Sequence, residues 1–190
     1  MTIMTAPMTR RDMRLTARRP ASRAPRILRA LGGLALVGLV VAGVHWSALY
    51  RTFEAKLAAI TLAPFVKGAG SSGGTFYLEQ NGGLLGLQIT GECTALILIA
   101  PLIVLAAVLL VFTRARAWRI AVGLVLMWVI ITAVNEARLA LIGFSSSTWG
   151  IDLGYTISHT YVGSVIGIFG FVAGLAALLI TTGTVRRKRR

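Results

Sequence analysis

Three side chains in this 190-residue chain have the chemistry of a nucleophile, a cation and a base, and each stands near the end of an apolar segment. Cys93 is the only cysteine, so it forms no internal disulfide, and it directly precedes a long apolar run. A thiol at a membrane–water boundary can ionise, whereas a thiol in hydrocarbon cannot, so this position suits a nucleophile. Arg138 interrupts the end of a second apolar run, and His159 stands just before a third.

Taken singly, each of these residues has a simpler interpretation. A lone cysteine is inert in most proteins, an arginine near a helix end can extend to lipid headgroups, and a loop histidine is usually solvated. Asn135 lies three residues before Arg138 on the same helical face and is the expected local partner of the guanidinium, whereas Glu136 would point away from it. His45 beside Trp46 is interpreted as part of an interfacial aromatic belt.

The composition indicates a multi-span membrane protein. Apolar residues make up 56% of the chain, the mean hydropathy is +0.77, and only six side chains are acidic, which excludes an ordinary soluble domain. The formal charge of +14 is clustered beside the apolar segments, so it is interpreted as a topology signal that also contacts anionic lipid, and not as a nucleic-acid surface. One cysteine and two histidines predict no metal site, and no cofactor is expected.

Four apolar segments are long enough to cross a bilayer, which takes about 20 residues. The predicted fold class is therefore an all-α polytopic membrane protein with about four transmembrane helices. The predicted spans are 27–50, 94–112, 118–144 and 161–181. A basic, disordered cytoplasmic arm (1–26) and a basic cytoplasmic tail (182–190) flank this membrane domain (27–181), and 145–160 is expected to be a short polar loop.

The long connection 51–92 is predicted to carry a small extracytoplasmic β-hairpin before the second span. Apolar residues alternate in 75–79 and 84–90, on both sides of Asn81-Gly82, a pattern typical of two strands joined by a tight turn. A Gly/Ser-rich segment before the hairpin is expected to be flexible. The hairpin would deliver the chain directly to the cysteine.

The distribution of basic residues places both termini in the cytoplasm. With the N-terminus inside, the inner segments hold eight arginines up to residue 29, three in 114–119 and five basic residues in the tail, against three in the outer segments. This asymmetry is the positive-inside pattern. Cys93 and His159 are then extracytoplasmic, and Arg138 reaches the same boundary because about 20 residues, at about 1.5 Å each, cross the hydrocarbon. Three predicted helices thus bring a thiol, a guanidinium and an imidazole to one leaflet.

Three segments, GECTALILIAPL, NEARLALIGF and HTYVGSVIGIFGF, resemble the exosortase/archaeosortase family of membrane transpeptidases in order, spacing and placement on helices, over about residues 75–180. The family's cysteine motif corresponds to Cys93-Thr94-Ala95, its Asn-x-x-Arg to Asn135 and Arg138, and its histidine to His159. Ala95 replaces the glycine that commonly follows in the motif, and the chain is shorter than the many-span members. Both departures leave the catalytic positions in place, and they bear on the substrate class.

The resemblance implies a cysteine transpeptidase of the plasma membrane with an extracytoplasmic active site. Its substrates would be surface proteins with a C-terminal sorting signal, made of a short motif, a transmembrane segment and a basic tail. The cleaved protein would pass to an amine-bearing acceptor such as a lipid. Cys93, Arg138 and His159 would be catalytic and Asn135 supporting, while the substrate-binding residues stay unassigned.

Two other functions fit the same residues. An interfacial cysteine protease would use water in place of the amine, and the sequence does not separate these two reactions. A non-enzymatic membrane assembly or accessory protein would instead bind a partner helix through small residues spaced at three or four, which let a neighbouring backbone approach closely. Those residues are Gly163, Gly167, Gly170 and Gly174. On this interpretation Cys93 is replaceable without consequence.

Overall fold

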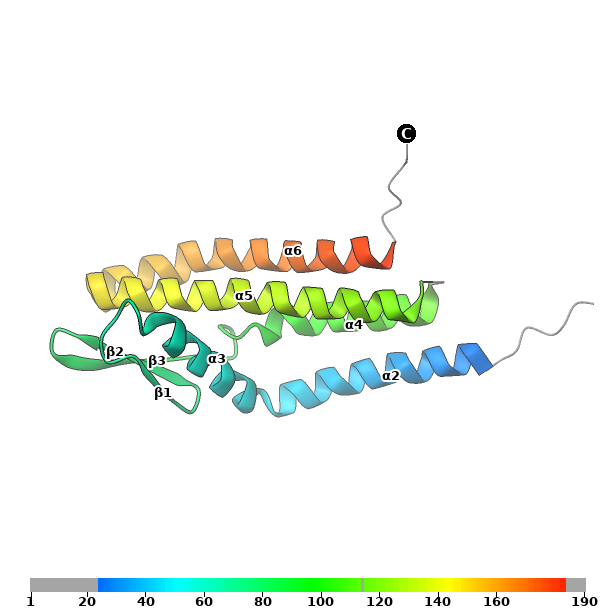
Figure 1. Cartoon of the computed structure of the whole chain (residues 1–190), viewed down its shortest axis with the longest axis horizontal. Helices are drawn as coiled ribbons and strands as arrows, with labels where there is room; N and C mark the ends of the chain where they lie inside the picture. The colour runs from blue at the N-terminus through cyan, green and yellow to red at the C-terminus, as the bar shows by residue number, and fades with distance from the viewer. Residues whose placement is uncertain (1–23, 114, 184–190) are drawn as a thin grey trace, which may run out of the picture.

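The computed structural model describes residues 24–113 and 115–183, so the arm up to residue 23, Arg114 and the tail from residue 184 lie outside the described residues. The described chain is mostly helical, with one small sheet (Figure 1). Its elements in order are α2 (Ala24–His45), α3 (Ser47–Leu62), β1 (Gly70–Ser72), β2 (Thr75–Gln80), β3 (Gly83–Gln88), α4 (Leu96–Phe112), α5 (Ala117–Gly150), η1 (Ile151–Tyr155), η2 (Ile157–Val162) and α6 (Gly163–Thr182).

The helices α2, α4, α5 and α6 run along one common axis, with the sheet at one end (Figure 1). α6 packs against α5, and α4 packs against α2 and α5. At the other end, Arg29 donates hydrogen bonds to the backbone carbonyls of Thr113 and Ala115, which ties the start of α2 to the α4–α5 turn. We call these two ends the sheet end and the turn end.

Within residues 24–113 and 115–183, three helical stretches are long and apolar enough to cross a membrane: 26–45, 117–155 and 157–182. Large apolar side chains on their outer faces, such as Leu34, Val125 and Ile168, are exposed, as lipid-facing residues are. The protein is therefore a multi-pass membrane protein. The count of four spans is not confirmed by length, because α4 is apolar throughout but has 17 residues. The first helix ends at His45, five residues before the end of the predicted span.

The expectation of a polar loop over 145–160 is wrong, because this stretch is helical. Its hydroxyl groups find acceptors in the helix itself: Ser146 Oγ donates to the carbonyl of Ile142 at 2.7 Å, a bond that lets serine remain within a helix. The chain reverses only at Gly150, where φ is 82° and a glycine is favoured. The third predicted span therefore continues six residues beyond residue 144.

The predicted hairpin is confirmed, and a third strand joins it. Gln80 pairs with Gly83, leaving Asn81 and Gly82 as a two-residue turn with φ of 50° and 81°. These positive values are those of the turn that matches the twist of a hairpin, and they explain the Asn-Gly pair. β1 adds to β2 and lies in the Gly/Ser segment that was expected to be flexible. Its three small residues carry no alternating pattern that would predict a strand.

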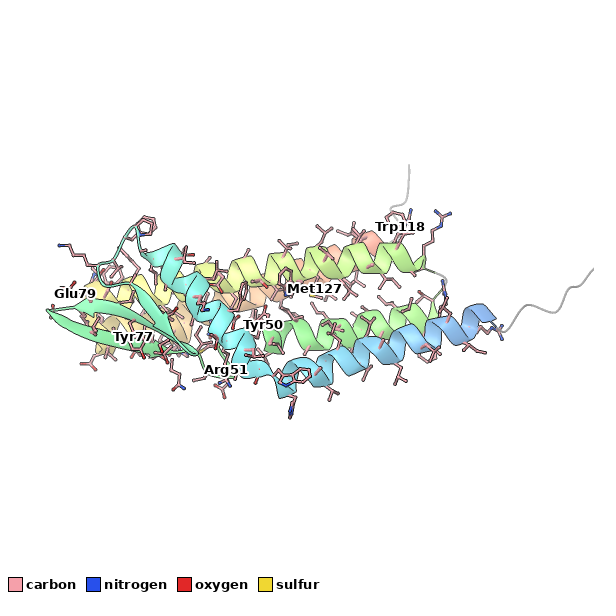
Figure 2. All side chains as sticks on the ribbon, turned by 60° about the horizontal axis from the view of Figure 1, so that its bottom comes forward. Tyr50, Arg51, Tyr77, Glu79, Trp118 and Met127 are labelled. Atoms are coloured by element: carbon pink, nitrogen blue, oxygen red, sulfur yellow. The ribbon has the colours of Figure 1, made fainter. Side chains whose placement is uncertain are left out.

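Two buried clusters meet at the start of α4. The first lies between α3, the sheet and α5, and consists of Ala55, Ala58, Ala59, Leu62, Phe76, Leu78, Ile89, Cys93 and Leu139. The second lies among the long helices and consists of Ala95, Ile99, Leu102, Ala106, Ile120, Met127, Ile131 and Leu178. Figure 2 shows α3 crossing between the sheet and the long helices, with Met127 among the latter. The turn from Cys93 to Ala95 is thus packed from both sides.

Most glycines of α6 pack against α5 of the same chain. A Cβ on Gly170 would lie 2.8 Å from the Val134 side chain, and one on Gly174 would lie 2.8 Å from that of Ile131. These glycines therefore let α6 approach α5 closely. Gly167 differs, because nothing lies within 4 Å of a Cβ placed there. The surface that the assembly interpretation reserves for a partner helix is largely covered by α5.

Candidate active site

Cys93 and His159 are paired at the sheet end. The Cys93 Sγ lies 3.1 Å from His159 Nε2, although the two residues are 66 positions apart. Cys93 is 6% exposed and His159 is half-buried. At this distance a thiol can donate its proton directly to an unprotonated imidazole nitrogen. The structure therefore brings two of the predicted catalytic residues into the contact that a nucleophile and its base require.

The turn between β3 and α4 holds Cys93. The backbone N–H of Cys93 donates to the carbonyl of Thr90 at 3.1 Å, and the N–H of Ala95 donates to Glu54 Oε1 at 2.8 Å. The first N–H groups of a helix have no acceptor within the helix. A carboxylate from α3 supplies the acceptor here, so the start of α4 is capped by a residue 41 positions earlier in the chain.

Glu54 was not predicted from the sequence as part of the site. Its side chain is fully buried, and its Oε1 also accepts from Asn135 Nδ2 at 3.0 Å. Burial raises its pKa, while the hydrogen bonds from Ala95 and Asn135 and the charge of Arg138 oppose that shift. One signal was available: Glu54 shares a helical face with apolar residues at i+4 and i+8, where a carboxylate is out of place.

Asn135 connects α5 to the turn that holds Cys93. It is 3% exposed, and its Nδ2 donates to the carbonyl of Cys93 at 3.1 Å as well as to Glu54. Its Oδ1 lies 3.5 Å from an Arg138 Nη1, at the outer limit of a hydrogen bond. The expected Asn135–Arg138 contact is present, but the short contacts of this amide are to the turn and to α3.

Arg138 lies one helical turn beyond Asn135, beside Gly163. Its Nε is buried without an acceptor among the described residues, and a Cβ on Gly163 would lie 2.9 Å from it. No ion pair with Glu136 is present in the described part of the chain, where both Glu136 carboxylate oxygens are buried without a partner. Nor does a hydrogen bond join the guanidinium to Cys93 or His159 within that part. Arg138 therefore retains donors for an incoming oxygen.

A groove of about 450 Å³ leads from this point along α4 and α6. Its lining residues are Glu92, Thr94, Leu98, Arg138, Gly163, Ser164, Gly167, Ile168 and Phe171. Two of its polar residues, Glu92 and Thr94, adjoin the cysteine in sequence, and the apolar side chains lie one to two helical turns farther along the helices. The groove thus changes from polar to apolar along α4 and α6, away from the sheet end.

Tyr155 is a second residue that the sequence analysis missed. Its ring stacks on the imidazole of His159, with centroids 4.9 Å apart and planes inclined by 13°. Both residues belong to the two short π-helical segments η1 and η2, which are wider than an α-helix and often occur at functional sites. An aromatic residue four positions before the histidine was the available signal.

The remaining polar residues do not join the pair. His45 is exposed at the end of α2 and meets Trp46 edge-on, with ring centroids 5.7 Å apart, as an interfacial residue would. Among the described residues, no group of three or more histidine, cysteine, aspartate or glutamate side chains is arranged to hold a metal ion.

Comparison with known proteins identifies a family. The family model described as transmembrane exosortase (Exosortase_EpsH) matches residues 21–179, which is most of the chain. No curated protein and no solved structure matches. The matched range contains Cys93, Asn135, Arg138 and His159.

Proposed function

The chain belongs to the transmembrane exosortase family, and from this premise we propose that it is a membrane-embedded cysteine transpeptidase. It cleaves the C-terminal sorting signals of surface proteins on the extracytoplasmic side and transfers the cleaved proteins to an amine acceptor. The observation that supports this most is the 3.1 Å contact between Cys93 Sγ and His159 Nε2. Apolar packing alone gives no reason for that contact at the end of a helical bundle.

Acylation begins with the thiol. Cys93 gives its proton to His159 Nε2, and the Sγ attacks the carbonyl carbon of the scissile peptide bond. The tetrahedral intermediate collapses as the carbon–nitrogen bond breaks, and His159 returns the proton to the departing amine. The surface protein is then held as a thioester on Cys93, and the membrane segment of its sorting signal is released.

Transfer repeats these steps in reverse order with a new amine. The acceptor gives a proton to His159 as its nitrogen attacks the thioester carbonyl, and the returning proton goes to the Cys93 sulfur. The new bond is an amide, so the overall exchange conserves one peptide-type bond. Water in place of the amine gives a free carboxylate, which is the protease alternative.

Arg138 stabilises the negative charge that develops on the carbonyl oxygen. Its guanidinium lines the groove beside Thr94, and it makes no hydrogen bond with the nucleophile or base in the described chain. A cation in a partly dehydrated site acts more strongly than the same cation in water. Asn135 supports the site by holding the backbone carbonyl of Cys93.

The groove between α4 and α6 accommodates the substrate. Its polar part, at Glu92, Thr94 and Arg138, suits the extended motif around the scissile bond, and its apolar part suits the start of the substrate's membrane segment. The open position at Gly167 leaves space for that segment. The change from polar to apolar lining supports a substrate in which a sorting motif is followed directly by a transmembrane helix.

The proposal includes four membrane crossings, with both termini cytoplasmic and the sheet end outside. α4 would cross as the shortest span, about 26 Å at about 1.5 Å per residue. The eight arginines up to residue 29 and the five basic residues of the tail then meet the anionic inner leaflet.

Mass spectrometry tests this function on protein purified from cells that also make surface proteins with such sorting signals. The expected result is an acyl adduct on Cys93 that hydroxylamine removes, and its absence from Cys93→Ala. The mass of the processed surface protein's C-terminus distinguishes amine transfer from hydrolysis. Unchanged processing in cells that carry only Cys93→Ala would show that the protein is not the enzyme and would favour the assembly interpretation.

A further inference from the structure

We propose that Glu54 is a positioning residue, whose carboxylate holds the Cys93 turn against α5 and so keeps the nucleophile at His159. The inference rests on the proposed function and assigns a role within the same site. Glu54 lies on α3, within the matched range 21–179 but away from the segments that carry Cys93, Arg138 and His159, and it does not touch the reacting atoms.

Both hydrogen bonds of Glu54 Oε1 connect it, directly or through Asn135, to the turn that holds Cys93. Oε1 accepts from the N–H of Ala95, two residues after the cysteine, and from the amide of Asn135. That same amide donates to the backbone carbonyl of Cys93. The peptide groups on the two sides of Thr94 are therefore held together by one carboxylate oxygen and one amide nitrogen. The Cys93 side chain leaves the backbone within this clamped turn, so its direction depends on the clamp.

Packing by itself does not account for a carboxylate at this position. Glu54 is 0% exposed, its neighbours on the buried face of α3 are alanines and a leucine, and its Oε2 has no partner among the described residues. Burying such a group is unfavourable unless it is hydrogen-bonded. An apolar residue would fill the space without that penalty, but it would leave the N–H of Ala95 without an acceptor. The hydrogen bonds that Oε1 accepts from Ala95 and Asn135 are therefore the reason for a carboxylate at this position.

Two substitutions of Glu54 separate the length of its side chain from its charge. Glu54→Gln keeps an oxygen acceptor at the same distance along the side chain and removes the charge. Glu54→Asp keeps the charge and withdraws the oxygen by about 1.5 Å, one carbon–carbon bond. A positioning role predicts that glutamine substitutes well and aspartate poorly. An electrostatic role predicts the opposite order.

Two further variants complete the set. Asn135→Leu removes the amide that links Glu54 to the Cys93 carbonyl, and it should behave like Glu54→Asp. Glu136→Gln is the matched control, because Glu136 is also a buried glutamate and its oxygens have no partner in the described chain.

The experiment measures alkylation of Cys93 by iodoacetamide at one fixed pH, on full-length protein in lipid nanodiscs. Because Cys93 is the only cysteine, the label reports a single site. We expect Glu54→Gln and Glu136→Gln to stay within about threefold of wild type and Glu54→Asp and Asn135→Leu to slow about tenfold, as loss of a buried N–H partner would produce. Processing in cells should follow the same order, with elution in gel filtration unchanged.

The outcome decides between the two roles. Wild-type alkylation by both Glu54→Asp and Asn135→Leu, or a glutamine variant slower than the aspartate variant, overturns the positioning role. Should Glu54→Asp elute as an aggregate, Asn135→Leu and Glu54→Gln still give the comparison. Alkylation of Cys93 requires neither a substrate nor the transfer reaction. It therefore tests the positioning role of Glu54 even if Cys93→Ala were to show that the proposed function is wrong.

Discussion

The guanidinium of Arg138 offers both a charge and a planar set of donors, and one substitution separates them. Arg138→Lys keeps the charge but loses the fork that can hold an oxygen from two directions. We expect processing of a matched substrate in cells to fall about 10²–10³-fold, the range for loss of an oxyanion donor. His45→Ala is the control and should process normally, because His45 is exposed at the end of α2 and its ring contacts Trp46. Wild-type processing by Arg138→Lys would mean that Arg138 acts only through its charge.

The thiol and imidazole are expected to respond differently to substitution. Cys93→Ala should abolish processing, and Cys93→Ser should fall almost as far, because a hydroxyl is a much weaker acid than a thiol and a base suited to the thiol ionises it poorly. His159→Ala should lose about 10²–10⁴-fold, the usual contribution of an acid–base group. Immunoblots of substrate size, with enzyme expression checked, provide the measurement. Substantial activity in Cys93→Ser would contradict a thiolate mechanism.

Glu54 should also make stability depend on pH. Burial raises its pKa in the folded protein, so the folded chain binds the proton more tightly than the unfolded chain does. Stability is then highest below the ordinary glutamate pKa of about 4.3, and it falls as pH rises from there through the raised value. Glu54→Gln has no ionisable group at this position and so lacks this pH-dependent contribution to stability. The Tm of wild type minus that of Glu54→Gln, measured in detergent, should therefore decrease as pH rises above about 4.3.

The exposed carboxylate of Glu79 supplies the comparison for that measurement. Glu79 lies at the sheet end (Figure 2), and Glu79→Gln is measured over the same pH range as the matched substitution of an exposed glutamate. A flat curve for Glu54→Gln would show that burial does not retain the proton on Glu54.

At the scale of elements, the proposed substrate path predicts that the spacing between α4 and α6 limits the entry of a substrate helix. Gly167→Leu places a large side chain in the groove, yet it should not disturb folding, because nothing lies within 4 Å of a Cβ there. We expect processing to drop about tenfold or more, since overpacking a fitted site costs about 1–3 kcal/mol. The thermal unfolding temperature should be unchanged or raised, since leucine favours helix more than glycine does.

Gly38→Leu on α2 is the matched control for that substitution. Its position is equally open, with nothing within 4 Å of a Cβ, and it does not line the groove. It should process substrate normally. Equal processing by Gly167→Leu and wild type would exclude the groove as the path of the substrate's membrane segment.

At the scale of the whole molecule, the prediction concerns orientation. The sheet end and the turn end should lie on opposite sides of the membrane, with Glu79 outside and Trp118 inside (Figure 2). In a Cys93→Ala background, a membrane-impermeant maleimide should label Glu79→Cys in intact cells and Trp118→Cys only after permeabilisation. Both positions are exposed, so accessibility within the fold does not limit the label. The reverse pattern would place the active site in the cytoplasm and exclude a role on surface proteins.

Local signals determined much of the architecture from the sequence alone. The apolar segments, the Asn81-Gly82 hairpin turn and the family resemblance around Cys93, Arg138 and His159 each depend on residues that are close together in the chain. Such signals indicate helices, strands and candidate chemistry before any packing is known. These signals assigned 145–160 to a loop because the segment is rich in serine and threonine. The sequence does not show that such a hydroxyl can hydrogen-bond to the backbone of its own helix, as that of Ser146 does.

Only the tertiary structure decided how these parts meet. The sequence predicted that the thiol and the imidazole reach one leaflet, but their 3.1 Å contact depends on how η2 packs against α5 and α6. It gave no role to Glu54, because the partners of that carboxylate lie 41 and 81 positions away and are reached only once α3 packs on α5. Which glycines of α6 are covered follows from the same packing. Local propensity carries no information about contacts between elements far apart in the chain, so these features become visible only in the assembled bundle.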